Sequence, residues 1–552
     1  MIRIDINGTR GEFPENTTVG EAVNALLPES EARQVLCCMC CGESWELMRP
    51  LTGDCTLVPL TYRDDEGRRT YERSLRFLLI LAVKRLWPGK KVRILHSVGH
   101  GIYFRFLGTD MSHETVKRLN TEMRLIIKED LPFETVVMSS EQADEYFRSQ
   151  GWKDKTALSR YRSSGEMHMY RIGPLTEDFY GSMVPRTGML DVFELRAYFP
   201  GAFLMLPDPA DPGRPAAYES CSGFLRQFHS SEEWCSILGA ENAADVNDML
   251  LNGDFRDFIR VNEMLQERMI FFAGDEICRR RARIVMIFGP SSSGKTTSAN
   301  RLGVYLRTLG KKTHLLSLDD FYRNRSDLPV EEDGQPDLES IDALDIPHLI
   351  TCLESLMSGA ETAMPRFDFT TQCRSPETVP LQLGNDDILL IEGIHGLNRQ
   401  IAGQMPEQLT YGIYVSALGC INLDNHNRIR TTDVRLLRRI VRDMRTRGTS
   451  PRETIAMWPK VRAGEEKWIF PNQEKADLMI NTSLHYELPV LRRYAWDVLN
   501  EIRPDEPEYL AARRLIKILQ FVLPLPDNLM DEIPPMSILR EFIGNSSFYD
   551  KH

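Results

Sequence analysis

The sequence Ile284-Val-Met-Ile-Phe-Gly-Pro-Ser-Ser-Ser-Gly-Lys-Thr-Thr297 sets the architecture of the second half of the chain. A short apolar run leads directly into a glycine, which is typical of a buried strand in a parallel sheet. Residues 289–296 then fill every fixed position of the pattern G-x-x-x-x-G-K-[ST]. A helix is predicted from Thr297 to about Leu309. The loop therefore has the strand–loop–helix context that phosphate binding requires.

The loop has the chemistry of a phosphate cradle. Its glycines let successive backbone N–H groups turn toward phosphate oxygens, and the start of the helix adds positive potential. We expect Lys295 to reach the terminal phosphates of a nucleotide and the Thr296 hydroxyl to bind Mg²⁺. A glycine-rich turn that matches by chance is the alternative, and the predicted flanking elements disfavour it. The residues expected to contact the nucleotide are Gly289, Pro290, Ser291, Ser292, Ser293, Gly294, Lys295, Thr296 and Thr297.

Two further apolar runs end in carboxylates. Leu315-Leu-Ser-Leu318 leads into Asp319-Asp-Phe-Tyr322, and Ile388-Leu-Leu-Ile391 leads into Glu392. A carboxylate at the carboxyl end of a strand can accept a proton from an attacking hydroxyl, which is the role expected of Asp319. We expect Glu392 to lie near the Mg²⁺ ion. The alternatives are an exposed aspartate in a turn and, for Glu392, a loop cap.

Eight arginines lie between residues 428 and 447. On a helix, Arg435, Arg438, Arg439 and Arg442 share one face by their spacing, and the apolar residues among them supply the opposite, packed face. Such charge runs are usually solvated surfaces. Beside a phosphate loop, the pattern indicates instead a lid whose guanidinium groups neutralise transition-state charge.

Composition limits the classes of protein that the chain can represent. It has 552 residues, of which 42% are hydrophobic and 26% charged, and a net charge of −12. At roughly 150 residues per domain, this is a globular protein of three or four domains. The acidic balance argues against nucleic-acid binding by bulk charge, although a local basic groove remains open. We expect no membrane segment or export signal, a cytoplasmic location, and eleven reduced cysteines.

From about Arg283 to Asn481 the chain resembles the uridine kinase/phosphoribulokinase family. That family has an α/β P-loop fold, a parallel sheet with flanking helices. It transfers the γ-phosphate of ATP or another nucleoside triphosphate to a sugar hydroxyl, in uridine kinases the 5′-hydroxyl of a pyrimidine nucleoside. The matching motifs follow the family's order and are the phosphate loop, Asp319–Tyr322, Arg366-Phe-Asp-Phe369 with Arg374, Glu392-Gly-Ile394, Asp433–Asp443 with Arg447-Gly448, and Phe470-Pro through Asp477.

The resemblance implies a role for each matching residue. Asp319 would be the general base, and Thr296 and Glu392 would organise Mg²⁺. Tyr322 would line the acceptor pocket, and Arg374 is a further candidate for binding the acceptor. The arginine helix would have two roles. Arg435 would reach the acceptor or the phosphates, and Arg438, Arg439 and Arg442 would form the lid. Lys295, Arg438 and Arg442 complete the expected catalytic set with Asp319.

Three positions depart from the family pattern. Glu339 stands where uridine kinases usually offer an aspartate to the ribose diol. Phe367 and Gln372 stand where the base-reading tyrosine and histidine are expected. Losing both would remove hydrogen bonds that specify uracil or cytosine, so the sequence predicts the reaction class more firmly than the acceptor.

The front of the chain resembles threonyl-tRNA synthetases. Residues 1–62 are similar to their small TGS domain, an α+β module of the β-grasp type, and residues 63–206 to the α+β editing-type domain that follows it. Leu81-Ala-Val-Lys-Arg-Leu-Trp-Pro-Gly89 and 184–190 carry the second likeness. The metal-binding positions of that domain read Arg73, Phe77, Tyr180 and Met183, none a zinc ligand. The editing chemistry is therefore expected to be absent.

Two other motifs resemble metal sites. His96 and His100 have i, i+4 spacing, but the glycines beside His100 favour a turn into a strand. Residues 37–41 read Cys-Cys-Met-Cys-Cys, and alternation along a strand would divide these thiols between two faces. We interpret the histidines as ordinary polar or packing residues and the cysteines as buried structural residues.

The chain is thus predicted to be multidomain. The boundaries are 1–62 for the TGS-like domain, 63–222 for the editing-like domain, 223–280 for a helical connector, 281–485 for the kinase domain and 486–552 for a C-terminal helical extension. The predicted function is ATP- and Mg²⁺-dependent phosphoryl transfer to a nucleoside or related hydroxyl acceptor. One alternative is another sugar-type acceptor. Another is a regulatory ATPase on tRNA or the ribosome, and the front half could also serve assembly alone. Self-association into a homo-oligomer is left open.

Overall fold

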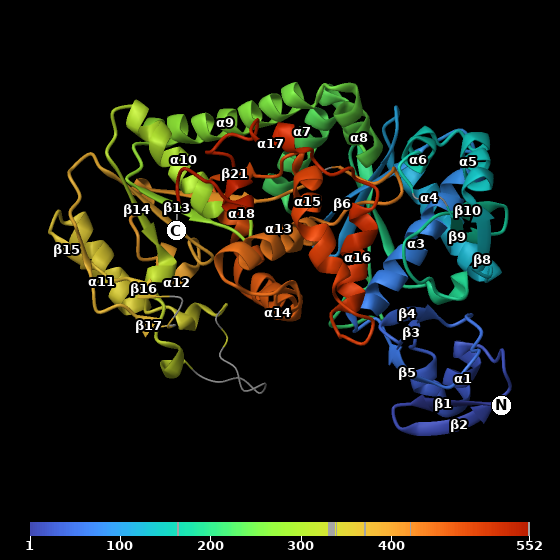
Figure 1. Ribbon diagram of the computed structural model, residues 1–552. Helices are drawn as coiled ribbons and strands as arrows, with labels where there is room; N and C mark the ends of the chain where they lie inside the picture. Colours follow the sequence, from blue (N-terminus) through green and yellow to red (C-terminus); the bar gives the residue numbers. More distant parts are fainter. Residues whose placement is uncertain are drawn as a thin grey trace.

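The computed structural model describes residues 1–162, 165–328, 337, 339–368, 371, 373–419 and 421–549. Figure 1 shows the two front domains at one side and the kinase half at the other, with the last long helices between them. Among the described residues, no helix combines the length and the apolar character needed to cross a membrane.

The first domain is a five-stranded sheet with a helix across it. The strand order is β2-β1-β5-β3-β4, and β1 pairs with β5 in parallel. A capping box between Thr18 and Glu21 starts α1, whose apolar side completes the core with alternate residues of β1. The elements are β1 (Ile2–Ile6), β2 (Thr9–Phe13), α1 (Val19–Leu26), α2 (Glu29–Ala32), β3 (Cys37–Cys40), β4 (Glu43–Glu46) and β5 (Cys55–Leu60).

The second domain is built around α3 (Asp65–Leu86), which is buried on nearly all sides. Two antiparallel sheets, ordered β11-β12-β7-β6 and β10-β9-β8, belong to this domain. Its other elements are β6 (Val92–Val98), β7 (Gly101–Phe106), α4 (His113–Glu129), β8 (Glu134–Ser139), α5 (Ser140–Ser149), α6 (Lys153–Ser159), β9 (Glu166–Ile172), β10 (Leu175–Glu177), β11 (Glu194–Tyr198) and β12 (Gly201–Met205).

The kinase half has a five-stranded parallel sheet in the order β14-β19-β13-β20-β21. Every residue of β13 is buried, as its continuous apolar sequence predicts. Three connector helices precede the sheet: α7 (Ser222–Leu238), α8 (Ala243–Asn252) and α9 (Phe255–Arg280). The main elements that follow are β13 (Ile284–Phe288), α10 (Lys295–Thr308), β14 (Thr313–Ser317), α11 (Ile346–Met357), β19 (Ile388–Gly393), β20 (Thr410–Ser416), α13 (Thr431–Thr446), α14 (Pro451–Gly464) and β21 (Leu478–Asn481).

Smaller elements lie between α11 and β20 and at the end of the chain. Those between α11 and β20 are β15 (Thr362–Met364), β16 (Phe367–Asp368), β17 (Cys373–Arg374), β18 (Val379–Leu381) and α12 (Arg399–Ala402). The last helices are α15 (Glu487–Asn500), α16 (Tyr509–Leu519), α17 (Asp527–Met530) and α18 (Arg540–Ile543). One apolar core joins α8, α9, α13, α14, α15 and α16, so the C-terminal helices pack as part of the kinase half.

Candidate active site

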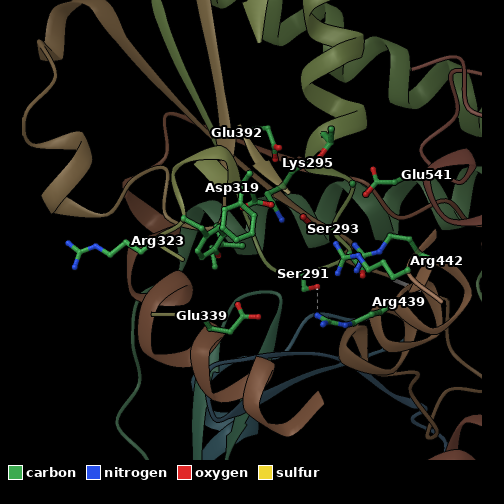
Figure 2. A pocket seen from close by; sticks show the side chains of 17 residues that line it. Ser291, Ser293, Lys295, Asp319, Arg323, Glu339, Glu392, Arg439, Arg442 and Glu541 are labelled. Atoms are coloured by element: carbon green, nitrogen blue, oxygen red, sulfur yellow. Dashed lines mark hydrogen bonds between the residues drawn. The ribbon is translucent and has the colours of Figure 1, made fainter. Parts of the chain in front are cut away.

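A cavity of about 290 Å³ opens at the carboxyl ends of β13, β14 and β19. Figure 2 shows Lys295 near its centre, Asp319 and Glu392 on one side, and Arg442 and Glu541 on the other. Parallel strands bring loops that are far apart in sequence to the same edge of a sheet. The lining residues are Ser291, Ser292, Ser293, Gly294, Lys295, Thr296, Asp319, Tyr322, Arg323, Glu339, Phe367, Glu392, Ile394, Arg439, Arg442, Arg447 and Glu541.

The phosphate loop requires glycine at both of its ends. A Cβ atom on Gly289 would lie 1.9 Å from the Val415 carbonyl oxygen, and Gly294 adopts a left-handed φ of +83° where α10 begins. Ser292 also has a positive φ, of 57°. Such alternation turns backbone N–H groups into a concave anion-binding surface. The Ser292 and Ser293 hydroxyls are buried and have no hydrogen-bond partner among the described residues, so the cradle offers unsatisfied polar groups.

The carbonyl groups of the loop are held from outside the cavity. Thr482 Oγ1 donates to the Ser293 oxygen at 2.5 Å, and Arg435 donates to the Ser291 oxygen at 3.0 Å. Because the carbonyls are used in this way, the loop is fixed before any ligand binds. Pro290 receives the Lys295 ammonium on its carbonyl oxygen at 3.1 Å.

Lys295 lies among carboxylates. Burial lowers its pKa, and Glu392, Asp319 and Glu541 oppose that shift. An incoming phosphate group would take the place of the Pro290 carbonyl as acceptor. Lys295 lines the cavity beside the phosphate loop, and its contact with a nucleotide stays a prediction.

Asp319 and Asp320 have different surroundings. Asp320 accepts from Arg366 at 3.2 Å and from the backbone N–H of Phe367 at 3.2 Å, so it holds the β16 strand. The Asp319 carboxylate faces the cavity and makes no hydrogen bond or ion pair with any described residue. Burial raises the pKa of Asp319, against the pull of Lys295. Of the two neighbours, Asp319 alone is available as a base.

Glu392 and Thr296 are suited to hold a divalent cation. Glu392 is buried and accepts a hydrogen bond from Ser317 at 2.8 Å. Burial and the nearby Asp319 raise its pKa to about 7, and a bound cation would relieve that cost. Mg²⁺ in kinases takes one or two protein oxygens and completes its shell with phosphates and water. These residues fit such an ion when a nucleotide is present.

The side of the cavity that is predicted to take the acceptor is formed by Tyr322, Glu339 and Phe367. The rings of Tyr322 and Phe367 lie 5.8 Å apart, centroid to centroid. Burial raises the pKa of Glu339 to about 7. Arg374 does not line the cavity: it donates to the Tyr322 carbonyl at 3.1 Å and pairs with Asp345 at 3.0 Å, so it supports the loop from behind. Gln372, expected to face the acceptor, lies outside the described residues.

The arginine helix α13 divides its arginines between two tasks. Arg439 and Arg442 line the cavity, and Arg439 donates to the Ser291 hydroxyl at 2.9 Å. Arg435 and Arg438 do not line it, contrary to the expected contacts with acceptor and phosphates. Arg435 is buried in a two-point ion pair with Glu465, and Arg438 is fully buried against Glu487, with Nε to Oε2 at 2.6 Å. Both pairs fix the helix under the phosphate loop.

Four cavity residues were missed by sequence reasoning in this role: Arg323, Ile394, Arg447 and Glu541. Glu541 comes from α18 and accepts a hydrogen bond from Thr297 Oγ1 at 2.7 Å. Ile538 of the same segment lies against Gly294. A residue 244 positions from its partner belongs to no local motif, so no sequence signal indicated it. The tail thus closes one side of the phosphate cradle.

The positions that correspond by resemblance to the metal ligands of editing domains lie close together but carry other chemistry. Arg73 packs on Gly181 and donates to the Ser182 carbonyl, and the rings of Phe77 and Phe179 lie 5.5 Å apart. The Ser74 hydroxyl contacts the Met183 sulfur at 3.4 Å. Arg73, Phe77 and Met183 thus make hydrogen bonds and packing contacts, and Arg73 and Tyr180 also line a cavity.

The members of the two other candidate metal motifs differ in their surroundings: His100 and Cys41 are exposed, whereas His96 and the other three cysteines are buried. His96 lies in β6, stacked at 3.8 Å on Phe228, and burial lowers its pKa. Cys38 belongs to the core of the first domain, whereas Cys37 accepts from the Thr70 hydroxyl of α3 at 3.4 Å. The predicted division of the cysteines between two faces is confirmed.

The Phosphoribulokinase / Uridine kinase family profile matches residues 284–487. The curated uridine kinase of Staphylococcus haemolyticus (strain JCSC1435) is 31% identical over 198 residues, covering 36% of this chain and 86% of that protein. The chain belongs to the phosphoribulokinase/uridine kinase family. Its kinase half is a P-loop kinase domain, which confirms the resemblance drawn from the phosphate loop and the arginine helix.

The front half matches a different group. The threonine–tRNA ligase of Carboxydothermus hydrogenoformans is 34% identical over 186 residues, covering 33% of this chain and 29% of that protein. The chain therefore spans about three-tenths of the length of this curated relative. A solved structure of a possible uridine kinase from Bacillus stearothermophilus aligns at 18% identity over 36% of this chain and 89% of that chain, with a TM-score of 0.26. That score is too low to support an argument about the site.

Proposed function

We propose that this phosphoribulokinase/uridine kinase family member transfers the γ-phosphate of ATP to a hydroxyl group of a nucleoside or a related sugar-type molecule. The observation that carries the proposal is the Asp319 carboxylate, which faces the cavity without a partner among the described residues, between the phosphate loop and the pair Tyr322 and Glu339. A phosphoryl donor site and an acceptor site would thus meet at the Asp319 carboxylate.

Each residue would act on a stated part of the reaction. Backbone N–H groups of Ser291–Thr296 and the Lys295 ammonium would hold phosphate oxygens. Arg439 and Arg442 would stand over the charge that develops on the transferred group. Asp319 would accept the proton of the attacking hydroxyl as the new bond forms. Bound ATP would supply the phosphoryl group, with Mg²⁺ held by Thr296 and Glu392 to screen its charge.

The acceptor pocket favours a flat or ring-shaped molecule that carries hydroxyl groups. Tyr322 and Phe367 offer two aromatic rings, and Glu339 offers a carboxylate that can accept from a diol. Phe367 cannot hydrogen-bond a base edge, which is why acceptors other than uridine and cytidine belong in the test. Glu339 would bind a diol best as the charged form, above its pKa of about 7.

The test is an acceptor panel with ATP and Mg²⁺, scored by product mass. Nucleosides, sugars and sugar phosphates are compared on the full chain. We expect one nucleoside or sugar-type acceptor to gain a single phosphate, and Asp319→Asn to lower kcat about 10²- to 10⁴-fold. Asp342→Asn is the matched control, because Asp342 is exposed in the same region and does not line the cavity.

Two outcomes would contradict the proposal. One is that no acceptor in the panel is phosphorylated by a chain that binds ATP. The other is that Asp319→Asn retains the rate of the unaltered chain on the acceptor that is found.

A further inference from the structure

A second cavity, of about 120 Å³, lies where the front domains meet the kinase half. We name it the junction pocket. It is bounded by α3, by the segment that leads into α13 and by α16, which Figure 1 shows between the two halves. Its lining residues are Ser44, Glu66, Arg69, Arg73, Arg76, Tyr180, Gly181, Leu423, Asn427, Arg428, Arg430, Asp433, Leu510, Arg513, Arg514, Lys517 and Ile518.

The junction pocket is strongly basic in an acidic protein. Eight of its lining residues are arginine or lysine, and two are acidic. The net charge of the whole chain is −12, so this concentration of positive charge is local. A concave surface lined by a single sign of charge raises the local concentration of the opposite ion.

Four carboxylates pair with six of the eight cations, so positive charge remains in excess. Glu72 is shared by Arg76, Arg428 and Arg430, and Arg69 pairs with Asp65, Arg73 with Glu66 and Arg514 with Asp433. In the described part of the chain, Arg513 and Lys517 make no ion pair or hydrogen bond, and Arg513 only borders the Tyr509 ring.

Buried nitrogens and shifted pKa values also indicate that the positive charge of the pocket is not fully compensated. Arg76 Nε and Arg428 Nε are buried without a hydrogen-bond partner among the described residues. Burial and neighbouring arginines lower the pKa of Arg430 to about 10, although Glu72 opposes the shift. Burial, Arg73 and Arg513 lower the pKa of Lys517. The cations repel each other at close range, which a bound anion would relieve.

We propose that the junction pocket binds a small anion that carries phosphate groups. Guanidinium groups match phosphate oxygens with paired N–H donors, and several arginines that converge on one cavity are the usual device for such recognition. A volume of about 120 Å³ has room for roughly one or two phosphate groups, since a water molecule occupies about 30 Å³. This site is separate from the phosphate loop and does not depend on the identity of the acceptor.

The pocket also touches the helix that carries the lid arginines. Asp433 lies in the first turn of α13 and accepts from Arg514 Nε at 3.1 Å. Arg442 is nine residues further along the same helix, or about 14 Å. An anion in the pocket would compete with Asp433 for Arg514. Occupancy would therefore alter how α13 is held and, through it, how Arg442 meets the active site.

Inorganic pyrophosphate, which has two phosphate groups, is the probe for this proposal. Because it can also bind the phosphate loop, it is titrated calorimetrically into the full chain carrying Lys295→Ala, which weakens the first site. We expect saturable binding to remain. Adding Arg513→Glu and Lys517→Glu should then weaken the remaining binding at least tenfold, whereas Arg503→Glu, on an exposed side chain outside the pocket, should change it little.

A second double variant keeps the test valid if the first one does not fold. If the double glutamate variant is unstable, Arg513→Gln with Lys517→Gln removes the same charges without reversal. Hydrogen exchange of residues 431–446 should change on adding pyrophosphate to the Lys295→Ala chain. The proposal is overturned if that chain binds no pyrophosphate, or binds it equally well without the two cations. Unchanged exchange in α13 would overturn the link to the lid.

Discussion

Glu392 is a carboxyl group whose surroundings oppose its charge. Burial and Asp319 raise its pKa to about 7, above the ordinary 4.5. The folded chain thus binds this proton more tightly than the unfolded chain does. The corresponding stability is fully present below pH 4.5 and is lost as the pH rises through 7.

Glu392→Gln removes this dependence. We expect the ligand-free variant to gain thermal stability relative to the unaltered chain as the pH rises from 5 to 8, with Tm higher by several degrees at the upper end. Scanning calorimetry without nucleotide or metal measures this. A difference in Tm that is constant across this range would show that Glu392 does not titrate there. Glu407→Gln, on an exposed side chain, serves as the control.

At the scale of elements, α13 carries both buried arginines that form ion pairs and arginines that line the cavity. Arg438 is fully buried and paired with Glu487, so Arg438→Met would leave a buried carboxylate without its cation. We expect a loss of about 3–5 kcal/mol in the free energy of unfolding, measured by urea denaturation. Arg442→Ala, at the cavity, should cost much less stability and lower kcat instead. Equal losses of stability in the two variants would contradict this division.

The phosphate loop and the arginine helix show how far sequence reasoning reaches. The loop was predictable because its strand, its glycines and its lysine are contiguous, and local backbone geometry decides their arrangement. Helical periodicity likewise placed four arginines on one face. It could not tell which of them are covered, because their partners Glu465 and Glu487 come from later helical segments. Glu541 was not predicted for the same reason, since tertiary packing alone brings it to the loop.

At the scale of the whole molecule, buried charges join the front half to the kinase half. Lys155 of α6 is 2% exposed, and its ammonium contacts Glu177 at 2.6 Å, Asp178 at 2.5 Å and Asp424 at 3.1 Å. Asp424 belongs to the kinase half. The sequence predicted the two halves separately from their likenesses, but nothing local indicated that they share this cluster.

Lys155→Met tests the strength of that joint. Removing the cation leaves three buried carboxylates facing each other, and we expect a loss of about 3–5 kcal/mol. Because the cluster spans both halves, the loss should lower the unfolding temperature of the front half and the kinase half together, as followed by calorimetry. Lys153→Met, on an exposed side chain two residues away, should have little effect. If Lys155→Met melts like the unaltered chain, this cluster does not hold the two halves together.

The contact of Ile538 and Glu541 with the phosphate loop has a consequence for how the protein is made. Thr297 and Glu541 are 244 positions apart, so at ribosomal speeds roughly 10–50 s separate their synthesis. Before Glu541 is synthesised, the phosphate loop can adopt its backbone conformation, but one side of its cavity is still open. The nucleotide site is therefore among the last parts of the kinase half to mature, after the sheet that supports it.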